Sequence, residues 1–102
     1  MVKGGKESVV RKLFRKGYIE ALLFIHERGE VRFADIRKFC LENGVVQSRG
    51  TVSHIVRGLT DMKLIERRIV ATRPIKTFYN ISEQGKKIVE HLKAIKQMLD
   101  AL

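Results

Sequence analysis

The chain is poor in several residue types that carry common protein chemistry. Among its 102 residues it has one cysteine, one proline and no tryptophan. A single cysteine, Cys40, excludes an intramolecular disulfide and a zinc site built from several cysteines. Cys40 follows Phe39 directly and Ile36 by one helical turn, and this spacing predicts a core position on a short helix rather than a redox sensor.

Catalytic patterns are missing too. The three histidines, His26, His54 and His91, fall in three different predicted helices, and none has a cysteine or carboxylate at metal-ligand spacing. The chain contains no GxSxG motif, phosphate-binding loop or dinucleotide-binding fingerprint. We therefore predict a binding protein rather than an enzyme, with no metal and no cofactor.

Long apolar runs are absent. The longest, residues 21–25, is far shorter than the ~20 residues that span a bilayer. No signal-peptide core follows the starting sequence MVKGG. We expect an intracellular protein without a membrane partner, located in the cytoplasm at the nucleoid.

Acidic residues are outnumbered, and the charge balance predicts a polyanionic partner. The chain has 21 Lys and Arg against 11 Asp and Glu, which gives a net charge of +10. A membrane surface or an acidic protein would also attract this charge. The size predicts one domain with a small core, which a partner subunit would help to stabilise.

Residues 45–68, VVQSRGTVSHIVRGLTDMKLIERR, form the most informative segment. Apolar residues recur at i, i+3, i+4 and i+7 from Val52 to Leu59, which predicts a helix over 48–62 with one buried stripe. Ser48 or Gln47 would cap it. The opposite side is polar and basic, as expected of a helix that contacts DNA. The candidate contacts here are Ser48, Arg49, Thr51, Ser53, His54 and Arg57.

These candidates differ in the contact with DNA that each would make and in the alternative role that each could have. Arginine can grip guanine through two parallel hydrogen bonds, so Arg49 and Arg57 are the best candidates for base contacts. Thr51 and Ser53 would contact DNA or simply serve the helix terminus. His54 would donate to a base or phosphate, or be a solvated surface histidine.

A basic hairpin follows this helix. The segments RRIVA and KTFYNI have strand chemistry and flank a tip at residues 72–75. Arg68, Arg73 and Lys76 are the candidate DNA contacts of this wing, and Arg73 suits the negative potential of a narrow minor groove. The cluster at residues 11–16, by contrast, is interpreted as a solvated basic face, with a DNA contact as the less favoured alternative.

The rest of the chain completes the predicted organisation. Residues 1–7 form a basic tail, and a helical stretch runs from its N-cap, Ser8, to Arg28, where Gly17 either splits or bends it. A short extended segment at 30–33 and a helix at 34–42 follow. The DNA-binding domain is expected to span 8–81.

Residues 82–102 are predicted to form a dimerisation helix packed on the same domain. Ser82 caps it, and its apolar residues follow the 4-3-4-3 spacing of a two-stranded coiled coil. The alternative is that this stripe packs on the first helix of the same chain. The predicted dimer-interface residues are Leu13, Phe14, Ile88, Leu92, Ile95, Leu99 and Leu102.

The pattern TVSHIVRGLTDMKLIERR, a hairpin, then FYNISEQGKKIVEHL resembles winged-helix transcription regulators of the MarR, PadR and HxlR families. Small archaeal and viral winged-helix proteins look similar. The most specific part is the string formed by Tyr79, Ile81, Ser82 and Gly85. This chain departs from the families at Lys63, where they often have glycine.

The resemblance implies an α+β fold: a winged helix-turn-helix with a three-helix core, a two- or three-stranded antiparallel wing and a long C-terminal dimerisation helix. It implies a homodimer on a pseudo-palindromic operator, with helix 48–62 in the major groove and the wing around Arg73 in the minor groove. The chain is shorter than many MarR relatives, which argues against a small-molecule effector.

We therefore predict a sequence-specific double-stranded DNA-binding protein that acts as a homodimeric transcriptional regulator. Two alternatives stay open at this stage. One is a non-specific architectural DNA-binding protein, and the other is a winged-helix adaptor that binds proteins.

Overall fold

The computed structural model describes the backbone of residues 9–102 and the side chains from Val10 onward. The predicted tail and the predicted N-cap Ser8 lie outside the described residues. In chain order the elements are α1 (Val9–Leu13), α2 (Tyr18–Arg28), β1 (Val31–Arg32), α3 (Phe33–Glu42), α4 (Arg49–Asp61), β2 (Ile65–Val70), β3 (Lys76–Ile81) and α5 (Glu83–Asp100).

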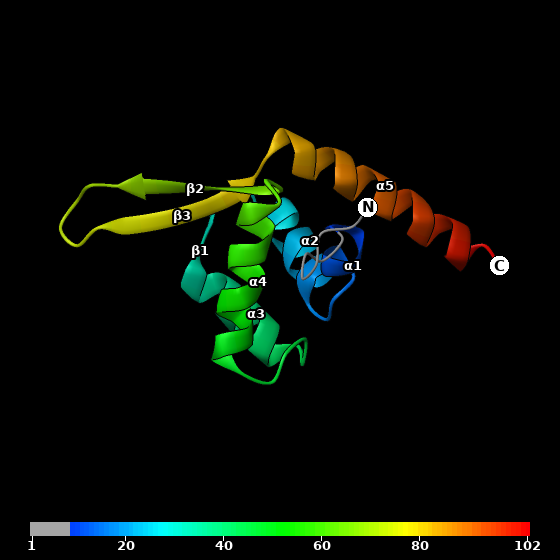
Figure 1. The fold of residues 1–102 in the computed structure, drawn as a ribbon, viewed down its shortest axis with the longest axis horizontal. Coiled ribbons are helices and arrows are strands. Elements are labelled where there is room, and N and C mark those ends of the chain that lie inside the picture. Colours follow the sequence, from blue (N-terminus) through cyan, green and yellow to red (C-terminus); the bar gives the residue numbers. More distant parts are fainter. Residues whose placement is uncertain (1–8) are drawn as a thin grey trace, which may run out of the picture.

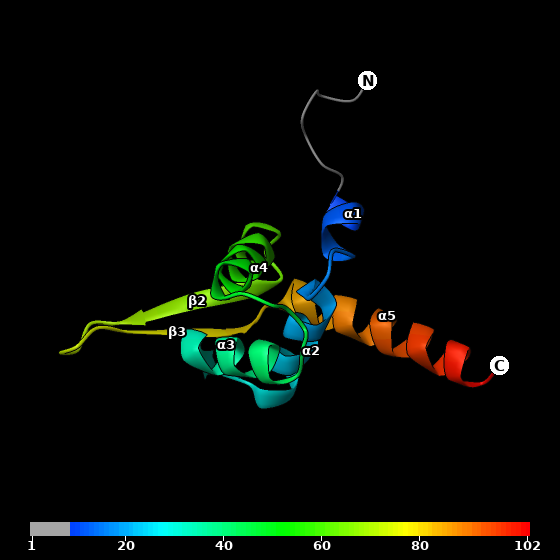
Figure 2. The same ribbon diagram turned by 90° about the horizontal axis from the view of Figure 1, so that it is seen from below.

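The predicted fold class, an α+β winged helix-turn-helix, is confirmed (Figure 1). The helices α2, α3 and α4 pack against one another. The wing is a three-stranded antiparallel sheet in the order β1-β3-β2. The β2–β3 hairpin projects from the helical body on one side, and α5 leaves it on the other (Figures 1 and 2).

One apolar core joins these elements. It is made by the stripes that the sequence periodicity indicated on α2, α3 and α4, together with the residues at the start of β2. The side chains with no exposed surface are Ala21, Leu22, Ile25, Ile36, Cys40, Val52, Ile55, Leu59 and Val89.

Gly17 splits the first helical stretch rather than bending it. Its φ of 93° lies in the left-handed region, which a side chain disfavours. A Cβ atom on Gly17 would also lie 2.6 Å from Cδ1 of Ile55. The chain therefore turns sharply here, and α1 stands apart from α2 (Figure 2).

The predicted strand at 30–33 is shorter than expected, because α3 already begins at Phe33. The Asp35 carboxylate accepts a hydrogen bond of 2.9 Å from the backbone N–H of Arg32. This bond satisfies an amide at the helix start, as in a capping box. Helix formation therefore starts directly after the two-residue strand β1.

The string of Tyr79, Ile81, Ser82 and Gly85 closes the fold at the start of α5. The Ser82 hydroxyl donates to the carbonyl of Lys63 at 2.6 Å and accepts from the N–H of Gly85 at 3.0 Å. Lys63 itself has a φ of 62°, a left-handed conformation that glycine adopts without strain and that agrees with the glycine expected at this turn from the family resemblance. Ser82 thus caps α5 as predicted and ties it to the turn after α4.

Only the first half of α5 packs on the body. Val89, which the coiled-coil pattern did not include, is fully buried, and Ile88 and Leu92 are partly buried against the core. Beyond them Ile95 and Leu99 are 48% and 62% exposed. The first part of the apolar seam of α5 therefore packs against the chain's own core, and the second part is exposed to solvent.

Candidate nucleic-acid interface

Helix α4 begins as predicted. The Ser48 hydroxyl accepts a hydrogen bond of 3.3 Å from the backbone N–H of Thr51, and the two hydroxyl groups lie 2.9 Å apart. Ser48, rather than Gln47, is therefore the N-cap. Thr51 takes part in the capping interaction, which agrees with its interpretation as a helix-terminus residue.

The polar side of α4 is open to solvent. Arg49, Ser53, His54 and Arg57 are all exposed. At about 100° per residue they fall within about 140° of the helix circumference. The structure thus brings these four predicted residues together on one outward face.

The side of α4 away from the wing packs on α1 and α2. The Tyr18 hydroxyl donates to the backbone carbonyl of His54 at 3.3 Å. A Cβ atom on Gly58 would lie 2.7 Å from the Tyr18 ring and 3.1 Å from Cε of Lys12. Lys12 of α1 therefore lies beside α4.

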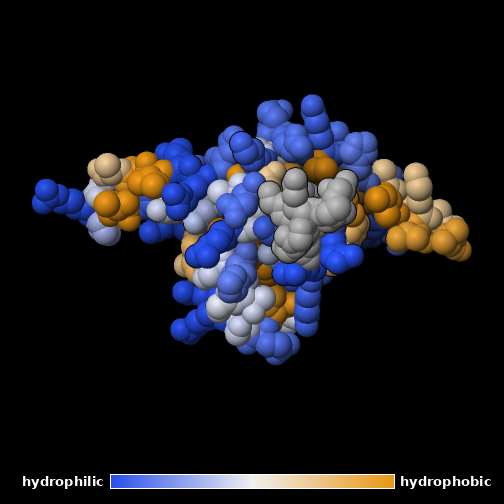
Figure 3. Space-filling model, in the orientation of Figure 1, coloured by the Kyte–Doolittle hydropathy of each residue, from blue (hydrophilic) through white to orange (hydrophobic). Residues whose placement is uncertain are grey.

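The wing carries exposed cations at its tip and also an apolar surface. Arg73 and Lys76 are exposed, as predicted for the tip. Ile69 and Ile75 are 56% and 67% exposed, which hydropathy patterning did not predict. Figure 3 shows this apolar area over the hairpin and a second one over the C-terminal end of α5.

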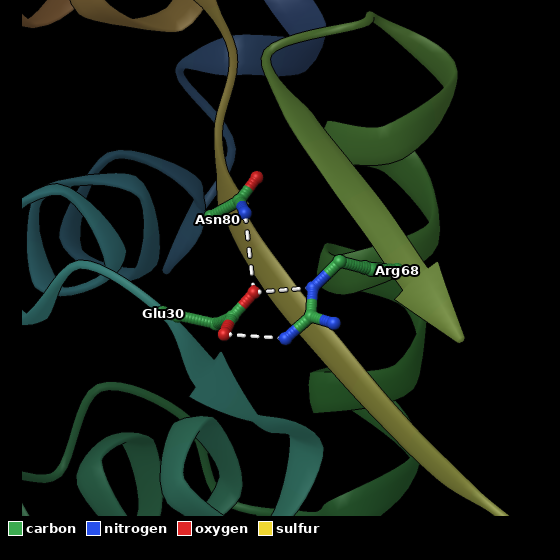
Figure 4. Close-up of polar contacts among 3 residues, drawn as sticks. All are labelled: Glu30, Arg68 and Asn80. Atoms are coloured by element: carbon green, nitrogen blue, oxygen red, sulfur yellow. Dashed lines mark hydrogen bonds and ion pairs between the residues drawn. The ribbon is translucent and has the colours of Figure 1, made fainter. Parts of the chain in front are cut away.

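Arg68 is placed differently from the other candidates of the wing. Its guanidinium donates to both carboxylate oxygens of Glu30, at 2.7 and 2.9 Å, and Asn80 donates to the same carboxylate at 3.4 Å (Figure 4). It also lies 4.9 Å from the centre of the Phe78 ring. The bound guanidinium lowers the pKa of Glu30, so the pair stays charged near neutral pH. Arg68 holds the base of the wing rather than pointing to α4.

Arg67 lies on the other face of the sheet. It is in register with Tyr79, and the two line a groove of about 380 Å³ between the wing and α4. The contacts predicted from the sequence include Arg68 and do not include Arg67. The signal was available, because Ile65 is a core residue and alternate residues of a strand share a face.

Cys40 is confirmed as a core residue, since its side chain has no exposed surface. Burial raises the pKa of its thiol, and the charge of Glu20 acts in the same direction. Only the thiolate reacts with alkylating agents. We expect iodoacetamide at neutral pH to label the native protein roughly a hundredfold or more slowly than the urea-unfolded protein, because reaction requires opening of the core. Equal labelling rates in the two states would contradict this placement.

Residues 9–102 contain neither a metal-binding cluster nor a membrane-spanning helix. No group of three or more His, Cys, Asp or Glu side chains in this range is arranged to hold a metal ion. None of the helices in the described part of the chain is long and apolar enough to cross a membrane.

The three-helix core, the exposed polar face of α4 and the β-wing are typical of the winged-helix transcriptional regulators. The model of the HxlR-like helix-turn-helix family matches residues 16–102, and the chain belongs to this family. The resemblance predicted from the sequence is thereby confirmed. Proteins of this class are regulators of transcription rather than enzymes. A search of curated proteins finds no match.

Solved structures share the fold at low sequence identity. A regulator of the MarR family from Enterococcus faecalis V583 has a TM-score of 0.77 and 9% identity, over 99% of this chain and 93% of the other. Diamide-treated YodB from Bacillus subtilis has a TM-score of 0.72 and 18% identity, over 100% and 97%. A PadR-like transcription factor from Bacteroides fragilis has a TM-score of 0.70 and 21% identity, over 92% and 94%.

Proposed function

We propose that this protein is a homodimeric transcriptional regulator that binds double-stranded DNA in a sequence-specific manner. The observation that carries the proposal is the outward polar face of α4 beside a projecting cationic wing. A major groove admits an α-helix, and base edges there distinguish all four base pairs. The proposed DNA contacts are Ser48, Arg49, Thr51, Ser53, His54, Arg57, Arg73 and Lys76.

Each part of the surface has its own task in this proposal. Arg49 and Arg57 read bases, while Ser48 and Thr51, at the N-terminus of α4, lie where a helix favours a phosphate. Arg73 enters the adjacent minor groove, where a narrow groove strengthens the negative potential. Arg68 is left out of the contact set because Glu30 occupies its guanidinium.

The homodimer rests on the exposed half of α5. Exposed apolar residues on one stripe of a small protein favour association. In the proposed dimer residues 8–81 form the DNA-binding domain and residues 82–102 form the dimerisation helix. Two subunits related by a two-fold axis would present their α4 helices to major grooves about 34 Å apart, which is one turn of DNA. The contacts are expected from Leu13, Phe14, Ile88, Leu92, Ile95, Leu99 and Leu102.

Selection of bound sequences from a random DNA pool tests specificity and symmetry together. The expected result is a pseudo-palindrome with half-sites one helical turn apart. Tight binding without sequence enrichment would identify an architectural DNA-binding protein instead. Failure to retain any DNA at low salt would favour the protein-binding adaptor.

The double variant Arg49→Ala/Arg57→Ala tests the base-reading face. We expect the Kd for the selected operator to rise about a hundredfold, because each bidentate contact is worth about 1–3 kcal/mol. Fluorescence anisotropy at fixed salt measures this change. The control Lys38→Ala/Lys87→Ala removes the same charge from exposed positions on α3 and α5. Equal losses in the two double variants would show that only net charge matters.

A further inference from the structure

A groove that is open to solvent lies between α4 and the wing, beside the proposed interface. It is lined by residues of α3, α4, β2 and β3. Cationic and hydroxyl-bearing side chains make up much of its wall. The lining residues are Phe33, Ser53, Val56, Arg57, Thr60, Asp61, Arg67 and Tyr79.

The two walls of the groove are set by separate elements. On one side, Ser53 and Arg57 stand one helical turn apart at the edge of α4 that faces the wing. On the other side, the register pairs Arg67 of β2 with Tyr79 of β3. Ile65 and Ile81 form the adjacent pair on this face, so the direction of Arg67 follows from the burial of Ile65.

The polar groups in this groove are suited to a phosphate. Arginine binds phosphate oxygens through a planar fork of N–H donors, and hydroxyl groups of serine and tyrosine add further donors. The single carboxylate of the lining, Asp61, belongs to the last turn of α4. A phosphate is therefore favoured between Arg57 and Arg67 and disfavoured farther along, toward Asp61.

We propose that this groove binds the sugar–phosphate backbone of DNA, with Arg67 and Tyr79 as contacts in addition to the residues of α4. The inference rests on the proposed function. A helix in the major groove and a wing in the neighbouring minor groove must straddle the phosphate backbone that separates the two grooves. The open space between α4 and the wing, walled by Arg57 and Arg67, is the place where that strand runs.

In this arrangement two adjacent residues of β2 have different roles. Arg67 positions the DNA backbone, whereas Arg68, on the opposite face, holds Glu30 at 2.7 Å. Phosphate contacts fix register but carry no base information. Loss of Arg67 should therefore weaken binding to every sequence to a similar degree.

Fluorescence anisotropy with the full chain and a double-stranded oligonucleotide tests the proposal over a range of salt concentrations. For Arg67→Ala we expect the Kd to rise about tenfold, as for the loss of a charge-assisted hydrogen bond. The salt slope should fall by about 0.9 for each protomer bound. The effect should be equal on the selected operator and on an unrelated duplex. Arg67→Lys should keep most of the slope, and Tyr79→Phe should raise the Kd about threefold.

The matched control is Lys87→Ala, which removes one charge from an exposed position on α5. It should change neither the slope nor the Kd by more than about twofold, because the charge lies away from the duplex. An Arg67→Ala slope equal to that of Lys87→Ala would overturn the proposal.

Circular dichroism and a thermal melt establish that each variant is folded. If the unmodified protein binds no DNA, the proposed function fails; if it binds and Arg67→Ala does not differ from the control, only the groove assignment fails.

Discussion

Replacing Gly85 with alanine is expected to destabilise the fold by about 3 kcal/mol, at the upper end of the cost of overpacking a filled site. The added Cβ atom would collide with the backbone carbonyl oxygen of Leu64 and approach Cγ1 of Ile81 to 2.7 Å. Backbone cannot rotate away as a flexible side chain can. Relief therefore requires moving α5 away from the start of β2, which also strains the hydrogen bonds of Ser82.

Urea unfolding at one fixed protein concentration measures this change, since association would otherwise alter the apparent stability. Gly50→Ala is the matched control. No atom lies within 4 Å of a Cβ atom at Gly50, which is also helical. This control should be neutral or stabilising by up to about 1 kcal/mol, because alanine favours helix over glycine. Equal unfolding midpoints for the two variants would show that the contact at Gly85 is not restrictive.

The second large effect is expected from charges on the exposed seam of α5. Ile95→Glu with Leu99→Glu would place four carboxylates in the apolar interface of a dimer, where unpaired charges are costly. We expect a monomer in analytical ultracentrifugation at micromolar concentration. The affinity for a two-half-site operator should fall by about 10² to 10⁴, because each subunit then binds DNA independently.

The control for this variant adds the same charge to another side of α5. Ala94 and Gln97 are exposed and lie at least about 80° around the helix from every residue of the seam. It should remain dimeric and lose little operator affinity. A monomeric unmodified protein, or equal dissociation in both double variants, would contradict the proposed dimer.

Much of the fold could be predicted because local patterns and tertiary packing agree. The stripe of α4 from Val52 to Leu59 is buried as its periodicity indicated, and Ser48 and Ser82 cap their helices. The start of α3 was harder to place, because a capping carboxylate three residues into the helix, Asp35, takes over from strand pairing at Phe33. Local hydrogen bonds decide where such a helix begins, and the hydropathy pattern of the sequence carries no information about them.

Long-range relations account for what sequence reasoning missed. A mid-helix glycine allows either a bend or a break, and it is the left-handed φ of 93° at Gly17 that shows a break in the folded chain. The coiled-coil spacing on α5 did not include Val89, because that residue faces the chain's own core beside the seam. The roles of Arg67 and Arg68 depend on which face of β2 each occupies. Strand register fixes that face, and composition and charge do not.

The Glu30–Arg68–Asn80 cluster holds the base of the hairpin in place and leaves its tip without comparable contacts. Phe78 lies between the guanidinium groups of Arg68 and Arg32, at 4.9 and 5.8 Å from its ring centre, so the base is clamped by stacking as well as by ion pairing. Beyond Arg68 the hairpin has no such clamp and little buried surface. If the protein binds DNA as proposed, the clamped base would hold the angle between the hairpin and the helical body, while the tip adjusts to grooves of different width without moving α4.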